Sequence, residues 1–261
     1  MALSPVRASA ARRVQYAQKL DDLIEEMANS VYYWLRASYR ADAPATIELA
    51  QDASPAKELQ SAFDKLSSRW LKRFDELGPK MATWFARGSR AQVDGKMAAD
   101  LRQAGMTVQF KMTPAMRDAY NAVIDENVGL IRSLASEHLT GVRTALMQSV
   151  QNGRDLAHLT EQLEKRHGIT RRRAQRIALD QNNKATAVMV RTRALELGCE
   201  KAKWLHSAGG KVPRKSHVAF SGKTFDLAKG HDFGDGFGAV LPGEAINCRC
   251  VSVPVVPGFD D

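Results

Sequence analysis

The chain has 261 residues, of which 44% are hydrophobic, so it can form one large core or two modest ones and is not a disordered tail. Three cysteines are too few for a disulfide framework, which indicates synthesis in a reducing compartment, the cytoplasm. The net charge of +9 favours polyanionic partners such as nucleic acid or acidic protein surfaces. No apolar run approaches the roughly 20 residues that span a bilayer, and we expect no membrane partner.

The first part of the chain predicts long helices. Apolar residues recur every three or four positions from about residue 9 to residue 40, which is the helical period, and Pro44 should end this helix. A second helix is predicted from Pro55 to Gly78 and Pro79, because proline favours the first turn and disrupts a helix interior. The helical pattern resumes over residues 80–104.

The middle of the chain continues this pattern. Residues 105–111 alternate like a short strand or an extended linker, and Pro114 then opens a helix that should run to about residue 151. Asp155 is expected to cap a short helix that closes at Gly168. Thr170 is expected to cap another helix that ends at Gly198.

The composition changes after Gly198. Ten of the eighteen glycines fall between residues 198 and 258, and the helical period disappears. Strands are expected over residues 201–207 and 245–253, with turns at residues 209–210 and 221–222. We therefore predict an α+β protein, with mainly long α-helices in residues 1–160 and a small loop-rich α+β module in residues 161–261 that contains a short antiparallel sheet.

Two cysteines near the end of the chain form the most specific local pattern. Cys248 and Cys250 are separated only by Arg249, and residues two apart on a strand point to the same face, so the two thiols should lie side by side. Together with His217 and His231 they could form a Cys2His2 zinc site, although C-x-C is tighter than the usual spacing. The alternative is that both thiols are small buried apolar groups.

The same residues could also serve nucleophilic catalysis. Cys248 or Cys250 would be the thiol, His217 or His231 the base, and Arg249 could lower the pKa of the thiol. No third residue that would orient the base can be named, and no known cysteine-enzyme signature surrounds the pair. The sequence therefore offers no convincing catalytic residue.

A basic block precedes the cysteines. Residues 165–223 contain fifteen Lys and Arg but only Asp180, Glu196 and Glu200 as acidic residues. Clustered guanidinium groups neutralise phosphates and give sequence-independent binding to nucleic acid. The alternatives are a solvated helix face or an acidic protein partner. The candidate nucleic-acid-binding residues are Arg171, Arg172, Arg173 and Arg176.

Four segments of the chain, taken together, resemble the phage head morphogenesis family, also called the Mu F-like or minor head protein family. They are R-R-A-Q-R-I-A-L-D-Q-N-N-K-A (172–185), E-L-G-C-E-K-A-K-W (196–204), P-R-K-S-H-V-A-F-S-G-K-T-F (213–225) and P-G-E-A-I-N-C-R-C (242–250). The last segment is the most specific. The residues that match the family motif by position are Trp204, Arg214, His217, Gly222, Phe225, Glu244, Asn247, Cys248, Arg249 and Cys250.

The chain departs from the family pattern at two places. The Arg-Thr-Glu of the family is Leu179, Asp180 and Gln181 here, and residues 209–210 replace an acidic residue that commonly precedes the motif arginine. Functions tied to those carboxylates do not transfer to this chain.

The resemblance implies a minor structural protein of a tailed-phage head, made in the host cytoplasm and located in the virion near the portal vertex. It would be non-enzymatic and act in head assembly or in DNA packaging and ejection. The implied partners are the portal protein, major capsid or scaffold proteins, and packaged double-stranded DNA, with residues 1–160 as the docking region.

Two other classes of function stay open. The first is an enzyme, either a metal-dependent nuclease or a toxin-like enzyme. A metal-dependent nuclease would need clustered carboxylates, and Asp232 and Asp235 form the only such pair near the basic block. A sequence-independent DNA-binding protein would need only the basic residues.

Overall fold

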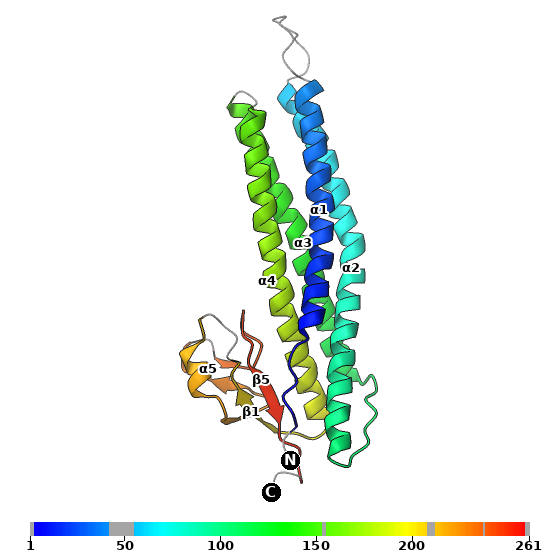
Figure 1. The fold of residues 1–261 in the computed structure, drawn as a ribbon, viewed down its shortest axis with the longest axis vertical. Coiled ribbons are helices and arrows are strands. Elements are labelled where there is room, and N and C mark those ends of the chain that lie inside the picture. Colours follow the sequence, from blue (N-terminus) through cyan, green and yellow to red (C-terminus); the bar gives the residue numbers. More distant parts are fainter. Residues whose placement is uncertain (1–2, 42–54, 153–154, 208–211, 237, 259–261) are drawn as a thin grey trace, which may run out of the picture. The chain divides into compact units, whose positions relative to one another are not determined.

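The structure is a computed structural model that describes residues 3–41, 55–152, 155–207, 212–236 and 238–258 (Figure 1). It confirms the predicted α+β class, since the long helices of the described residues are followed by short strands. In chain order the elements are α1 (Ala10–Ala41), α2 (Pro55–Gln103), α3 (Pro114–Gln151), α4 (Leu156–Glu196), β1 (Lys201–Leu205), α5 (Lys215–Ala219), β2 (Thr224–Asp226), β3 (His231–Asp232), β4 (Ala239–Val240) and β5 (Val251–Pro254).

Several predicted helix ends are confirmed. Helices α1 and α3 have the expected extents. Residues 105–111 form no strand, since Gly105 belongs to a turn after α2 and residues 106–111 have no regular secondary structure. Asp155 caps α4, because its Oδ1 accepts a hydrogen bond of 2.9 Å from the backbone N–H of His158. Gly198 follows the end of α4 with a φ of 77°, the left-handed conformation that glycine adopts without strain. Pro44, where the first helix was expected to end, and the turn expected at residues 209–210 lie outside the described residues.

The helix break expected at Gly78 and Pro79 is wrong, because α2 continues through both residues. A proline inside a helix removes one hydrogen bond and crowds the preceding turn, at a cost of about 3 kcal/mol. The apolar face of α2 is buried on both sides of Pro79, with Phe74 1% exposed and Ala82 and Phe85 fully buried. Burial of this continuous face offsets the cost of the proline.

The break expected at Gly168 is also wrong, because α4 runs without interruption to Glu196. Thr170, predicted as a helix cap, lies in the helix interior. Its hydroxyl donates to the backbone carbonyl of Arg166 at 3.0 Å, and Oγ1 lies 2.9 Å from Nδ1 of His138 on α3. The hydroxyl is thus satisfied without ending the helix.

The chain divides into two compact units. The helical unit consists of residues 17–81 and 127–177, which are parts of all four long helices. Its core is aliphatic and aromatic and follows the helical period. Its buried residues include Leu20, Ile24, Met27, Val31, Leu35, Leu59, Phe63, Phe74, Ile131, Leu134, Leu139, Val142, Leu146, Leu159 and Leu163. None of the described helices is long and apolar enough to cross a membrane.

The strand-bearing unit consists of residues 1–16, 82–126 and 178–261. Arg193 of α4 is 1% exposed and joins three segments of this unit. Its guanidinium pairs with both carboxylate oxygens of Asp94 on α2, at 2.7 and 3.0 Å. It also donates to the carbonyl of Lys111 at 2.8 Å and to Glu196 at 2.7 Å. These contacts tie the extended segment before α3 to α2 and α4.

The C-terminal module of this unit, residues 199–258, contains two small antiparallel sheets among the described residues. The first has the strand order β2-β1-β5, and the second pairs β3 with β4. The strand predicted over residues 245–253 is wrong in part, because β5 begins at Val251. Cys248 and Cys250 therefore lie in the loop before β5 and not on a strand. Pro254 lies on β5 at the edge of the sheet, where the missing N–H is tolerated.

The predicted division at residue 160 lies within α4, which is continuous from Leu156 to Glu196. The two compact units group segments by contact and not by order along the chain. The assignment of docking to residues 1–160 and of the family module to residues 161–261 stays a prediction.

Candidate metal centre

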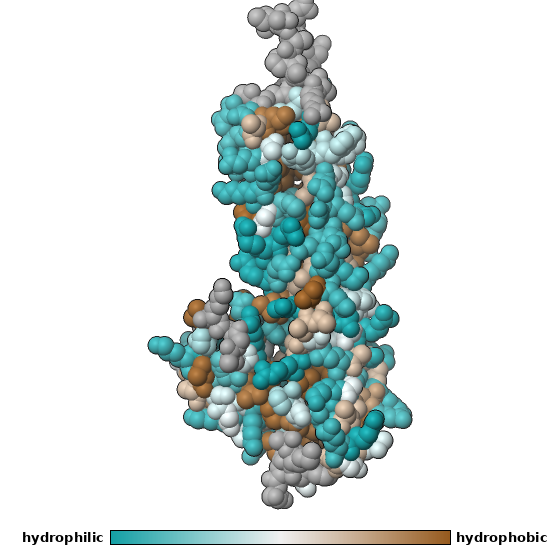
Figure 2. Space-filling model, viewed as in Figure 1, coloured by the Kyte–Doolittle hydropathy of each residue, from teal (hydrophilic) through white to brown (hydrophobic). Residues whose placement is uncertain are grey.

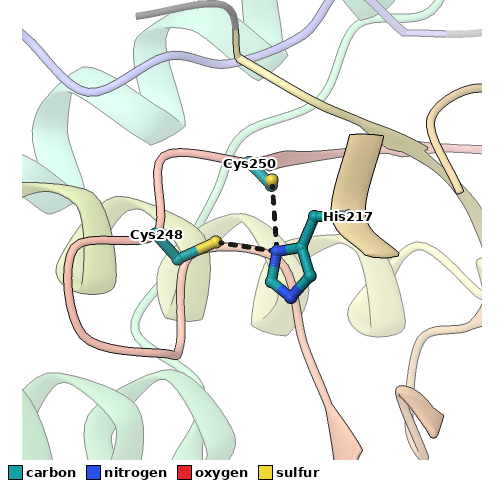
Figure 3. Close-up of side chains that lie close together, drawn as sticks. All are labelled: His217, Cys248 and Cys250. Atoms are coloured by element: carbon teal, nitrogen blue, oxygen red, sulfur yellow. Dashed lines mark hydrogen bonds between the residues drawn. The ribbon is translucent and has the colours of Figure 1, made fainter. Parts of the chain in front are cut away.

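Three side chains of the C-terminal module converge on one point. The Sγ atom of Cys248 lies 3.6 Å from Nδ1 of His217, and the Sγ atom of Cys250 lies 3.7 Å from the same nitrogen. Figure 3 shows both sulfur atoms pointing toward this nitrogen of the imidazole ring. All three residues are buried, with exposed fractions of 3 to 6%. Among the described residues, this is the group of His, Cys, Asp and Glu whose ligand atoms are close enough to hold a metal ion.

Backbone geometry places the two cysteines beside each other although they lie on a loop. Asn247 has a φ of 61°, and the turn it forms directs Cys248 inward. The backbone N–H of Asn247 donates a hydrogen bond of 2.7 Å to Oδ1 of Asp180 on α4. The predicted neighbourhood of the thiols is therefore confirmed, but a turn anchored to α4 produces it and not a strand.

Gly243 brings the same loop against α4. Its φ of 82° favours glycine, and a Cβ atom at this position would lie 2.8 Å from the Cβ of Ala187. Glu244 stabilises the turn, since its Oε2 accepts a hydrogen bond of 2.8 Å from the N–H of Leu241. The P-G-E segment thus holds the loop that carries both cysteines.

Aromatic rings surround the His217 side of the cluster. Trp204 of β1 is fully buried, and its ring meets His217 edge-on with centroids 5.0 Å apart. Phe233 stacks on His217 at 4.8 Å, and Phe225 of β2 meets Trp204 at 5.6 Å. These rings fix the position of the imidazole and exclude water from that side.

The two thiols influence each other's pKa in opposite directions. The hydrogen bond from Cys250 lowers the pKa of Cys248 to about 5, because it stabilises the Cys248 thiolate. The same hydrogen bond, together with burial, raises the pKa of Cys250. The pair therefore loses its first proton readily and its second with difficulty.

His231, the other predicted metal ligand, is not part of the cluster. Its ring stacks on Phe220, with centroids 3.7 Å apart, and meets Phe233 edge-on at 4.7 Å. His231 thus contributes to the aromatic packing around Trp204. The four residues predicted as a zinc site are not brought together as a set, and only three of them share one point.

The remaining motif residues support the loop and the sheet. Arg214 precedes α5 and donates a hydrogen bond of 2.9 Å to the carbonyl of Ile246. Gly222 has a φ of 85°, and its N–H donates to the carbonyl of Trp204 at 2.7 Å. Arg249 lies with Arg214 in the lining of a small pocket that borders the cysteines. The motif is therefore a set of contacts that define the fold around the cluster.

The four predicted nucleic-acid-binding arginines lie in the helical unit, and two of them form ion pairs within it. Arg171 lies 3.6 Å from Asp21, and Arg173 forms an ion pair of 3.1 Å with Glu137. Arg172 and Arg176 are exposed and form no ion pair with the described residues. Of the four candidates, Arg172 and Arg176 could therefore bind a phosphate without breaking an ion pair to the described residues.

Sequence reasoning missed two features of the site. It treated Asp180 as a departure from the family, whereas this residue anchors the cysteine loop. It also missed Phe220 and Phe233, which complete the aromatic cluster. Their positions in a glycine-rich stretch give no periodic signal, because the packing arises from tertiary contacts.

The chain is similar along most of its length to an uncharacterized protein of Haemophilus influenzae. The two are 28% identical over 260 residues, which is 97% of this chain and 55% of that protein. The chain thus spans about half the length of this relative. No solved structure matches.

A family model matches the region that contains the cluster. The model is described as phage Mu protein F like protein, and it matches residues 140–253. This range includes α4, the sheet of β1, β2 and β5 almost completely, and all ten motif residues. Residues 140–253 therefore match the phage Mu F-like family, which supports the head morphogenesis assignment that the motifs indicated.

Proposed function

We propose that the protein is a minor structural component of a tailed-phage head. It is made in the host cytoplasm, enters the virion, and associates with the portal vertex during head assembly or DNA packaging and ejection. The observation that carries this proposal is the P-G-E-A-I-N-C-R-C segment, which folds against Trp204 and His217 inside the region that matches the family model.

The helical unit supports a docking role. In the face shown in Figure 2, hydrophilic residues cover most of the helical surface, and hydrophobic residues gather in separate patches. Tyr33 and Trp34 of α1 are 68% and 51% exposed. Trp34 borders a groove between α1 and α2 that is also lined by Leu59 and Phe63. Large exposed aromatic residues beside an apolar groove are suited to binding a helix of an oligomeric partner such as the portal protein.

The charge of the chain supports a position near packaged DNA. The net charge of +9 gives a field that attracts polyanions, and of the four candidate arginines Arg172 and Arg176 are exposed without an ion pair to the described residues. Major capsid or scaffold proteins with acidic surfaces would also be attracted. The charge therefore supports a location in the virion, but it does not distinguish contact with DNA from contact with acidic head proteins.

A non-enzymatic role is favoured because the family is one of structural head proteins. A nuclease that uses Mg²⁺ would need carboxylates that converge on a metal. In the part of the chain that the structure describes, the converging group consists of one histidine and two cysteines. Asp232 uses its Oδ1 to accept a hydrogen bond of 2.8 Å from the N–H of Gly234, as in an ordinary turn.

Co-purification of the full-length chain with the portal oligomer tests this proposal. We expect a complex with a fixed stoichiometry that persists in high salt, measured by native mass spectrometry. The double variant Tyr33→Ala/Trp34→Ala should weaken the complex, because both side chains are exposed on α1. Leu195→Ala, at a 41% exposed position of α4, is the matched control and should not. A portal that purifies without this chain contradicts the proposal.

Sequence-independent DNA binding is the second candidate, favoured by the two accessible arginines. If it is the main activity, the double variant Arg172→Ala/Arg176→Ala should lower the salt slope of binding to random duplex by about 2, since each phosphate contact contributes about 1. Arg73→Ala is the control, because Arg73 is already paired with Glu26 at 2.8 Å. Equal slopes for both variants would dismiss this candidate.

A further inference from the structure

The distances in the His217, Cys248 and Cys250 cluster match those of a tetrahedral zinc site. Bonds of about 2.3 Å to sulfur and about 2.0 Å to nitrogen place two donors of such a site about 3.5 Å apart. The two sulfur-to-nitrogen distances are 3.6 and 3.7 Å. Both sulfur atoms face the same nitrogen, as Figure 3 shows, so one ion can contact all three atoms.

Hydrogen bonding alone explains this arrangement poorly. A neutral imidazole offers at Nδ1 either one lone pair or one N–H, so that nitrogen can serve one of the two thiols but not both. The second thiol therefore gains little from this nitrogen as a hydrogen-bond partner, whereas a metal ion would bind both sulfur atoms together with the nitrogen. Two buried sulfur atoms directed at one nitrogen therefore have the arrangement of ligands around a metal ion.

A second observation comes from Trp204. Its indole Nε1 is buried and makes no contact with the described residues that has the geometry of a hydrogen bond. A buried donor without a partner costs free energy and requires an explanation, for which an ion at the site is one of the known cases. A thiolate held by a metal is a strong acceptor and would give this buried donor a partner.

A third observation concerns the surroundings of the cluster. A pocket of about 50 Å³ borders both cysteines and His217, and its lining also includes His206. A cavity of this volume is large enough for an ion, since a single water needs only about 10–15 Å³. Arg214 and Arg249 also line the pocket, but an arginine does not act as a ligand. His206 is thus the remaining imidazole of the pocket.

We propose that Nδ1 of His217 and the two thiolates of Cys248 and Cys250 bind one Zn²⁺ ion, with His206 as the fourth ligand. His206 follows β1 directly and lies outside the group of three closely spaced ligands, so its side chain would have to rotate toward the ion to complete the site. Two thiolates balance the charge of Zn²⁺, and the mixture of sulfur and imidazole ligands suits zinc over magnesium or calcium. His231 is excluded because its ring stacks on Phe220.

The proposed ion would have a structural role. It would connect α5, the loop before β5 and the end of β1, which are the segments that carry the family motif. The C-terminal module has short strands and many glycines, and a bound ion stabilises such a module by binding only its folded state. This inference does not depend on the proposed role in the phage head, and its failure would leave that role untouched.

Cobalt substitution of the full-length protein tests the proposal without any variant. Co²⁺ bound to two thiolates in a tetrahedron gives intense visible bands and a sulfur-to-metal charge-transfer band. We expect these bands to saturate at one Co²⁺ per chain and to disappear when one equivalent of Zn²⁺ is added. A protein that binds neither ion at that stoichiometry, or that gives only the weak spectrum of six-coordinate Co²⁺, overturns the proposal.

Variants identify the ligands. Cys248→Ser, Cys250→Ser and His217→Gln should each lower the affinity for Zn²⁺ at least about 100-fold, and His206→Gln should lower it about 10-fold or more. His231→Gln is the matched control for His206→Gln and should leave the affinity unchanged. Unchanged affinity in either cysteine variant overturns the site. A loss in His231→Gln together with no loss in His206→Gln overturns the assignment of the fourth ligand.

Discussion

The helical unit and the C-terminal module are stabilised in different ways. The helical unit distributes its burial over many aliphatic residues that recur at the helical period on four helices. The module relies on a few contacts, namely the rings around Trp204 and the loop that Asp180 and Gly243 hold against α4. A single substitution at one of these contacts, or at the buried Arg193 of the same strand-bearing unit, should therefore have a larger effect than one at a half-exposed position of the helical unit.

Trp204→Ala should have the largest effect, because the fully buried indole contacts several other rings. We expect a loss of about 3–5 kcal/mol in the free energy of unfolding, measured by urea denaturation with near-ultraviolet circular dichroism. Trp34→Ala, at a half-exposed position of the helical unit, should cost less than about 1 kcal/mol. Similar losses for the two variants would remove the difference between the regions.

Arg193→Ala should cost a similar amount, about 3–5 kcal/mol, since it leaves the carboxylates of Asp94 and Glu196 near each other without their buried counter-ion. In the helical unit, the pair of Arg73 and Glu26 is half exposed, and Arg73→Ala should cost less than about 1 kcal/mol. Thermal unfolding of both variants in the same buffer measures the contrast. An effect of Arg193→Ala as small as that of Arg73→Ala would contradict it.

Gly243→Ala should destabilise the protein by about 2–4 kcal/mol. The change forces a positive φ on a residue with a Cβ atom and pushes that atom against Ala187 of α4. Gly236 has nearly the same φ of 83°, but a Cβ atom there would meet no other atom within 4 Å, so Gly236→Ala should cost only about 1–2 kcal/mol. Differential scanning calorimetry of the two variants isolates the contact with α4, and equal costs would mean that this contact is unimportant.

His138 makes the helical unit sensitive to acid. Burial, followed by His167 and Arg166, lowers the pKa of His138 to about 4. The pKa of His138 in the folded state is below the unfolded value of 6.5. The contribution of this residue to the free energy of unfolding is therefore complete above pH 6.5 and is lost as the pH falls toward 4. We expect the unfolding free energy to fall by about 2–3 kcal/mol between about pH 7.5 and about pH 4.5 from this group. His138→Gln should flatten that dependence, and an unchanged slope would argue against a neutral buried histidine.

The helices show how much of the fold the hydrophobic periodicity of the sequence can predict. It located α1 and α3 because their apolar faces are regular and their ends carry proline or cap residues. It failed at Pro79 and Gly168, where burial of a continuous face outweighs a local preference for breaking the helix. Local signals report the cost of a residue in a helix but not the packing that compensates for it.

The site shows a different limit. The C-x-C spacing and the motif correctly placed Cys248, Cys250 and His217 together, although the strand assumed for the cysteines was wrong. His231 could not be separated from His217 by sequence, because its stacking on Phe220 depends on the path of the glycine-rich loop. His206 and Asp180 acquire their roles only when β1 and α4 meet the loop.

The number of copies of this chain in purified phage heads is the decisive test of the proposed role in the virion. Quantitative mass spectrometry of particles from an induced host, with the portal protein as the internal standard, provides that number. We expect the chain to be present in a few copies per particle and to remain with the portal when heads are dissociated in high salt. Heads that assemble fully and contain none of this chain would contradict that role.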